Sequence, residues 1–133
     1  MVTDEDLIKA AIAAMGRAYA PYSGFPVGAA ILDEDGAIHA GANIENAAYP
    51  VGNCAEASAI AAMIVAGRKH ITKIAVAGGD GELLCTPCGA CRQRIREFAA
   101  AETPVLVCGP EGLQQSFTLA ELLPASFGPE NLA

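Results

Sequence analysis

The stretch Thr86-Pro87-Cys88-Gly89-Ala90-Cys91-Arg92-Gln93 places two cysteines three residues apart, where a loop runs into a helix. Proline is tolerated in the first turn of a helix, so Pro87 predicts that the helix begins here, and good helix formers continue to Ala101. Residues three apart share one face of a helix, so both thiols should point the same way. The partial positive charge at a helix N-terminus favours the thiolate, which is the form that binds metal ions. The stretch therefore predicts two ligands of a metal site.

A third cysteine lies upstream in Cys54-Ala55-Glu56, where a turn leads into a helix predicted over residues 54–66. Catalytic zinc sites have three protein ligands and leave the fourth position open for water, whereas structural sites are closed by four ligands. The three cysteines together therefore predict a catalytic zinc site. Glu56 is placed to reach the water without binding the metal. A ligand-x-Glu sequence followed by Pro-Cys-x-x-Cys is the pattern of the zinc-dependent deaminases.

Two other interpretations of the cysteines stay open from the residues alone. Cys88 and Cys91 fit a redox-active Cys-x-x-Cys pair, although that leaves Cys54-Ala55-Glu56 without a role. A closed structural zinc site needs a fourth ligand, for which the sequence offers His39, His70, Cys85 and Cys108. Cys85 forms a second, overlapping Cys-x-x-Cys, but it precedes the predicted helix and falls off the face that the other two share.

Composition predicts one domain over residues 1–133. Hydrophobic residues make up 53 % of the chain, enough for a packed core. No apolar run reaches the roughly 18 residues of a membrane span. The chain begins with acidic residues where a signal peptide would be basic, and its five cysteines are an odd number. These features predict a cytoplasmic protein without a membrane partner, whose cysteines serve metal binding rather than disulfides.

The charge of the chain excludes most nucleic-acid binders. Its net charge is −7, and only eight residues are Lys or Arg, with a short basic cluster over residues 92–96. Proteins that bind nucleic acids need a basic surface to neutralise phosphates. A substrate that carries a base is therefore predicted to be a free nucleoside or base rather than a tRNA or a DNA strand.

Hydrophobic periodicity predicts alternating helices and strands. The predicted helices cover about 4–19, 54–66, 87–101 and 119–123, and the predicted strands cover 27–32, 37–42, 73–78, 104–108 and 113–117. Thr3 is the expected N-cap of the first helix with Asp6 as its capping partner, and Asp35-Gly36 predicts a hairpin between the first two strands. The strand–helix–strand alternation that follows predicts a mixed α/β sheet with helices on both faces.

Five segments of the chain, in this order, resemble the small homotetrameric cytidine deaminases. They are Pro21–Ala30, Asn43–Ala47, Cys54–Glu56, Pro87–Gln93 and Leu122–Pro129. The resemblance implies a three-layer α-β-α sandwich with a five-stranded mixed sheet. It also implies a homotetramer whose active sites are shared between subunits, with a small nucleoside as substrate.

The resemblance also implies a role for each site residue. Cys54, Cys88 and Cys91 would hold one Zn²⁺ per chain, and Glu56 would carry protons. Substrate binding would fall to Phe25 for the base, to Asn43 and Glu45 for the ribose hydroxyls, and to Tyr49 and Phe127, which would reach into a neighbouring subunit's site. From spacing alone, Asn43 and Glu45 indicate only turn chemistry at a strand end. Likewise, Phe25, Tyr49 and Phe127 taken alone indicate packing residues.

One position departs from the family. Its members commonly carry an arginine directly after Cys-Ala-Glu, where it offsets the negative charge of the thiolates, but here the residue is Ala57. Three thiolates on Zn²⁺ leave a charge of −1, which makes the zinc a poorer Lewis acid unless another group compensates. Arg92, the two helix N-termini and a hydrogen bond from Ser58 are the expected sources. Ala57→Arg is accordingly expected to keep or improve activity.

The activity implied is hydrolytic deamination of cytidine and 2′-deoxycytidine to the uridine counterparts and ammonia, a reaction of pyrimidine salvage. Zinc-activated water would attack the base while Glu56 shuttles protons. An alternative within this chemistry is a deaminase of another aminopyrimidine nucleoside, such as a nucleoside antibiotic. An alternative of another class is a non-catalytic zinc or redox module, which would have no need of Glu56.

Overall fold

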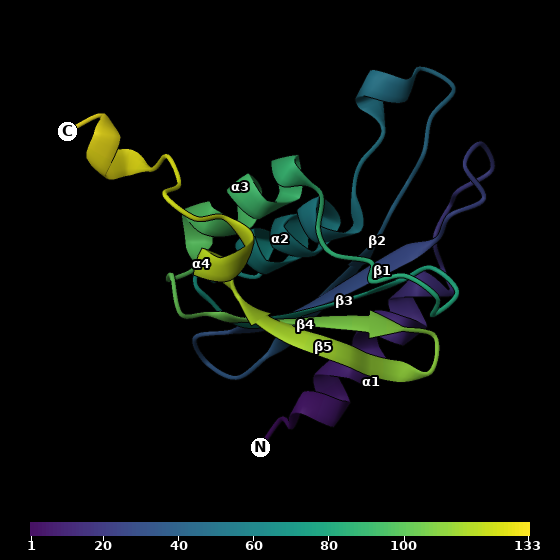
Figure 1. The fold of residues 1–133 in the computed structure, drawn as a ribbon, viewed down its shortest axis with the longest axis horizontal. Coiled ribbons are helices and arrows are strands. Elements are labelled where there is room, and N and C mark those ends of the chain that lie inside the picture. The colour runs from purple at the N-terminus through teal and green to yellow at the C-terminus, as the bar shows by residue number, and fades with distance from the viewer.

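A five-stranded mixed sheet forms the middle layer of the protein, which the computed structural model describes over residues 1–133 (Figure 1). The strand order is β2-β1-β3-β4-β5, with β3 and β4 parallel and every other pair antiparallel. The strands are β1 Val27–Asp33, β2 Ile38–Ala42, β3 Ile71–Gly78, β4 Pro104–Gly109 and β5 Gly112–Thr118. The predicted hairpin, strand count and mixed pairing are all confirmed.

The three central strands are buried on both faces because a layer of helices covers each side. Successive side chains of a strand point to opposite faces, so neighbouring residues enter different cores. In β3, Ile74 and Val76 pack into the core beneath α2 and α3, whereas Ala75 and Ala77 pack against α1. The small side chains on the second face let α1 approach the sheet closely. The three-layer α-β-α arrangement predicted from the resemblance is therefore confirmed.

Helix α1, Asp4–Met15, begins as predicted and ends earlier than predicted. Its first turn is closed by a capping box in which Thr3 and Asp6 exchange hydrogen bonds. The prediction extended the helix to Tyr19, but the chain leaves it at Gly16. Tyr19 instead donates its amide to the carbonyl of Asn43 at 3.0 Å, so its backbone pairs with the segment that follows β2. A tertiary hydrogen bond thus replaces the last predicted helical turn.

Helices α2 Ala55–Val65, α3 Gly89–Phe98 and α4 Leu119–Leu122 lie over the opposite face of the sheet (Figure 1). Helix α3 begins at Gly89 with Cys88 as its N-cap, so Pro87 precedes the helix rather than lying in its first turn. It ends at Phe98 because Ala99 adopts an extended conformation and pairs with Ile71. None of these helices, nor α1, is long and apolar enough to cross a membrane.

Helix α2 has an exposed apolar face that its composition does not reveal. Ala59, Ile60 and Met63 are buried against the sheet, in keeping with the i, i+3, i+4 spacing of one helical face. The opposite face carries Ile64 and Val65, and Val65 is 88 % exposed. The helix therefore buries one stripe within this chain and leaves another apolar stripe in solvent.

Candidate active site

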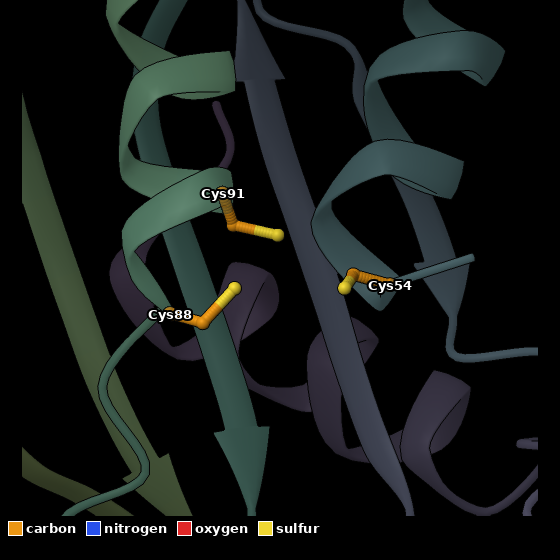
Figure 2. Close-up of side chains that lie close together, drawn as sticks. All are labelled: Cys54, Cys88 and Cys91. Atoms are coloured by element: carbon orange, nitrogen blue, oxygen red, sulfur yellow. The ribbon is translucent and has the colours of Figure 1, made fainter. Parts of the chain in front are cut away.

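Three cysteine sulfurs meet where α2 and α3 begin. Cys54 is the N-cap of α2, Cys88 is the N-cap of α3, and Cys91 lies in the first turn of α3. Their Sγ atoms all lie within 4.8 Å of one another. Figure 2 shows the three sulfurs pointing from two helices into one shared space. The predicted cysteine cluster is therefore present, and the two helix N-termini bring it together.

Both N-cap cysteines are unusual, because Ser, Thr, Asp and Asn are the residues that normally cap helices. Thr3 and Thr118 cap α1 and α4 with side-chain hydrogen bonds, whereas neither Cys54 nor Cys88 forms one. The sequence thus gives up a capping interaction at the two helix starts that face each other. A sulfur at these positions is better suited to binding a metal ion than to holding the helix end.

The electrostatics of the cluster differ from one thiol to the next. Burial raises the pKa of Cys54 and of Cys91, and the neighbouring acidic groups raise the pKa of Cys91 further. Burial also acts on Cys88, but the backbone amides of Cys91 and Ala90 outweigh it, so the pKa of the Cys88 thiol is lowered. Without a cation, only Cys88 is shifted toward the thiolate. All three sulfurs can become thiolates together only if a bound cation offsets their negative charge.

The donor set fits zinc. Zn²⁺ prefers thiolate and imidazole ligands, and Zn–S bonds of about 2.3 Å place the sulfurs of a tetrahedral site about 3.8 Å apart. Sulfurs within 4.8 Å of one another reach that spacing through small side-chain movements. Three ligands leave the fourth position of a tetrahedral ion to water or substrate.

The residues considered as a fourth ligand lie elsewhere. His39 Nε2 is 2.7 Å from Oδ2 of the buried Asp33, in the hairpin that joins β1 to β2. Cys108 is buried inside β4, among the residues that face α1. Cys85 lines the pocket beside the cluster but is not one of the sulfurs that gather within 4.8 Å. The cluster is therefore an open three-ligand set, as the sequence predicts for a catalytic site.

A pocket next to the cluster gathers most of the predicted site residues. Glu56, the second residue of α2, is only 4 % exposed. Burial raises the pKa of its carboxyl group. The pocket is lined by twelve residues, and six of them carry a predicted role in the zinc-binding, catalytic or substrate site: Phe25, Asn43, Glu45, Cys54, Glu56 and Cys88. A buried carboxyl group thus lies beside two of the clustered cysteines in one cavity.

Asn43 and Glu45 also hold the wall of this pocket together. The amide of Asn43 accepts a hydrogen bond from Val27 N at 2.8 Å and donates one to Phe25 O at 3.0 Å. The Glu45 carboxylate accepts from the amides of Tyr22 and Ser23 and from the Ser23 hydroxyl. The Ser23 hydrogen bonds lower the pKa of Glu45. Spacing along the sequence did not reveal this bracing role, because the partners lie 16 to 23 residues away.

Tyr49 and Phe127 are predicted site residues that do not line this pocket. Tyr49 is 75 % exposed, and it lines an adjoining pocket that also contains Asn43, Glu45 and Cys54. Phe127 is 58 % exposed on the C-terminal segment, where its carbonyl accepts a hydrogen bond from Gln93 at 2.9 Å. Within one chain the structure brings Tyr49 to the edge of the site but does not bring Phe127 there.

Arg92, which was predicted to offset the thiolate charge, points elsewhere. Its guanidinium donates to Pro87 O at 2.6 Å, to Leu122 O at 2.7 Å and to Thr86 Oγ1 at 3.1 Å. The guanidinium makes no hydrogen bond to a cysteine sulfur. These contacts join the loop before α3 to the end of α4, so Arg92 has a bracing function in this structure.

The arginine that contacts the cluster is Arg94, which sequence analysis missed. Its Nη1 lies 3.5 Å from Cys91 Sγ. Ser58 was another expected source of compensation, but its hydroxyl accepts a hydrogen bond from Asn53 and makes none to a cysteine sulfur. The helical spacing contained the signal, because residue 94 lies one turn after residue 91 on the same face.

Comparison with known proteins gives a consistent result. Residues 1–107 match the family model described as the cytidine and deoxycytidylate deaminase zinc-binding region. The chain is 46 % identical over 126 residues to a cytidine deaminase of Halalkalibacterium halodurans, covering 95 % of each protein. It is 38 % identical over 119 residues to a cytidine deaminase of Mycobacterium tuberculosis, covering 90 % of this chain and 85 % of that protein. The crystal structure of a cytidine deaminase from Burkholderia pseudomallei superposes with a TM-score of 0.88 at 40 % identity, covering 95 % of this chain and all of the other.

Proposed function

Because the chain belongs to the zinc-dependent cytidine and deoxycytidylate deaminase family, we propose that it hydrolyses cytidine and 2′-deoxycytidine to uridine and 2′-deoxyuridine. Water adds its oxygen to C4 of the cytosine ring, the C4–N4 bond breaks, and ammonia leaves. The observation that carries this proposal is one buried glutamate beside an open three-cysteine cluster, in a pocket with polar groups at its rim.

Cys54, Cys88 and Cys91 hold the metal in this proposal, with one Zn²⁺ per chain. When bound, zinc supplies the Lewis acidity that makes water a nucleophile at neutral pH. The cysteines contribute three thiolates and leave one position of the site open. The start of α3 helps to hold the Cys88 sulfur as a thiolate.

Glu56 handles the protons. Its carboxylate oxygens take a proton from water, deliver it to ring N3, and carry a second proton to the departing amine. Burial raises the pKa of the Glu56 carboxyl, which brings it closer to the pH at which it must both accept and release protons. The buried position also keeps bulk water away from the proton while it is being transferred.

The rim of the pocket suits a neutral nucleoside. We assign Phe25 to the face of the base, and Asn43 and Glu45 to the ribose hydroxyls, which an amide and a carboxylate can bind directly. Glu45 is held ionised by the Ser23 hydrogen bonds, which lower its pKa. An anionic carboxylate at the sugar end repels a phosphate, so we expect nucleosides to be preferred over nucleotides.

We further propose that residues 1–133 act as one catalytic domain within a homotetramer. The exposed rings of Tyr49 and Phe127 and the apolar face of α2 at Ile64 and Val65 support an assembly in which neighbouring subunits complete each site. The three cysteines must stay reduced to bind zinc, which favours the cytoplasm. There the reaction would serve pyrimidine salvage.

Absorbance of the cytosine ring tests the proposal directly. Purified protein of known zinc content is mixed with cytidine, 2′-deoxycytidine or cytidine monophosphate, and the loss of the cytidine band is followed. Turnover of both nucleosides at about one zinc per chain supports the assignment, with the monophosphate a poor substrate. A fully zinc-loaded protein that converts neither nucleoside contradicts it and redirects attention to other aminopyrimidines.

A further inference from the structure

Arg94 lies where its guanidinium can act on the cysteine cluster. It follows Cys91 by one turn of α3, and helical side chains lean toward the N-terminus of their helix, so the side chain reaches back over Cys91. The distance from Nη1 to Sγ is 3.5 Å. An arginine never loses its charge in a protein. A permanent positive group is therefore in hydrogen-bond contact with one member of the cluster.

No carboxylate is in ion-pair contact with this guanidinium. Of the three arginines on α3, Arg96 is paired with Glu130, and Arg92 donates to two backbone carbonyls and a threonine hydroxyl. Arg94 has no acidic partner within 4.0 Å, and its hydrogen bond goes to sulfur. Hydrogen bonds in which both partners are charged are stronger than neutral ones, so this contact gains strength once metal binding makes Cys91 a thiolate.

The space around Arg94 explains how it reaches the cluster from α3. Ala57 follows Cys54 by one turn of α2, just as Arg94 follows Cys91 by one turn of α3. Ala57 and Arg94 line the same surface pocket between the two helices. The alanine at position 57 places no long side chain in this pocket, which Arg94 lines from the other helix.

We propose that Arg94 is a positioning residue that offsets the charge of the three thiolates from α3, since position 57 on α2 is an alanine and cannot do so. This inference rests on the proposed zinc-dependent function. Three thiolates on Zn²⁺ leave a net charge of −1, and their electron donation weakens the metal as a Lewis acid. A guanidinium that binds Cys91 draws electron density from that sulfur, which restores the acidity on which the reaction depends.

The test compares Arg94→Gln, Arg94→Lys and the double variant Ala57→Arg/Arg94→Gln. The first readout needs no substrate: with Co²⁺ in place of zinc, the sulfur-to-cobalt charge-transfer band reports electron donation by the thiolates. We expect Arg94→Gln to move this band to longer wavelength. Arg94→Lys keeps the charge and should move it less. In the double variant the arginine at position 57 supplies the positive charge from α2, and the band should move back toward its wild-type position.

Kinetics with zinc supply the second readout. We expect Arg94→Gln to lower kcat for cytidine by about 5- to 30-fold, which corresponds to about 1–2 kcal/mol. KM should stay within about threefold, because Arg94 does not line the pocket that holds Phe25 and Glu56. The double variant should recover most of kcat. Arg17→Gln, which removes an exposed arginine from outside the site, is the matched control and should change neither readout.

An unshifted cobalt band together with unchanged kcat in Arg94→Gln would overturn the proposal. So would a double variant that shifts the band as far as Arg94→Gln alone. Should Arg94→Gln fail to fold, Arg94→Lys decides the question. The lysine variant keeps the positive charge, so a fall in its kcat of about 5- to 30-fold would leave no role for charge and overturn the proposal. If the wild type converts no cytidine, the proposed function fails, but the cobalt band still tests Arg94.

Discussion

Replacing Glu56 with glutamine tests the mechanism most directly. Glutamine has nearly the same size and shape, so the packing of this buried residue against the start of α2 should be kept. What it loses is the ability to accept and release a proton. A positioned acid or base contributes about 10²- to 10⁴-fold to a rate. Glu56 is assigned two transfers, to ring N3 and to the amine, so kcat should fall by at least about 10⁴-fold, or roughly 5.4 kcal/mol.

The same variant should not weaken the fold. Burial raises the pKa of Glu56, which means that folding disfavours its ionised form. For an acid with a raised pKa, this cost is present at pH values above the folded-state pKa and disappears as the carboxyl becomes protonated. Glutamine removes the cost, so the zinc-free variant at pH 8 should unfold at the same temperature as the wild type or at a higher one.

The assay measures kcat at saturating cytidine together with zinc content and thermal unfolding. Glu102→Gln makes the same chemical change at an exposed position outside the site and should leave all three unchanged. A zinc-loaded Glu56→Gln protein whose kcat lies within about 100-fold of the wild type would refute the two-proton role. A variant that loses zinc, or unfolds earlier, would show that the carboxylate is needed for structure rather than for proton transfer.

Three further perturbations test the fold and the metal. Gly28→Ala should destabilise the protein by about 2–4 kcal/mol in urea unfolding, because the new Cβ would lie 2.1 Å from Ala11 O and push α1 away from the sheet. Gly16→Ala is the control and should be nearly neutral, since its new Cβ would lie 3.4 Å from the nearest atom. Asp33→Ala should cost about 2–4 kcal/mol at pH 7 by leaving His39 and two backbone amides unpaired. Burial raises the pKa of Asp33, but the hydrogen bonds from His39 and the two amides outweigh it and the pKa is lowered. The stability tied to the ionised carboxylate is therefore present above about pH 4 and is lost at lower pH, so the difference between the two proteins should narrow there. Chelating the zinc should abolish turnover and lower the unfolding temperature seen by circular dichroism, and one equivalent of zinc should restore both; an apo protein that unfolds like the holo protein would contradict a metal bound by the folded state alone.

The sequence determined the features that depend on local interactions. Thr3 and Asp6 lie three residues apart, which fixes a capping box whatever the rest of the chain does. The near-continuous apolar run of β1 is typical of a buried strand, and Asp35-Gly36 predicted the hairpin after it. The spacing of Cys88 and Cys91 placed both at one helix start, so two ligands of the cluster were readable from the chain alone.

Tertiary structure decided which side chains the site actually uses. Arg92 is adjacent to the cysteine motif in sequence, yet it turns to the carbonyls of Pro87 and Leu122, because α4 packs beside α3 only in the folded protein. Arg94 reaches Cys91 because the opposite side of α3 faces the pocket beside α2. Helical spacing limits which residues can share a face, but it does not say what that face will meet.

The same distinction holds for polar groups that bond across long sequence distances. Glu45 is bound by Tyr22 and Ser23, and Asn43 by Phe25 and Val27, so these residues brace the pocket through hydrogen bonds that no local pattern encodes. Local propensity acts over one turn of helix or a few residues of strand, and it therefore determined most of each element and the pairing of Cys88 with Cys91 at one helix start. The choice of partners over longer separations follows from packing the helices on the sheet, and only the folded chain determines it.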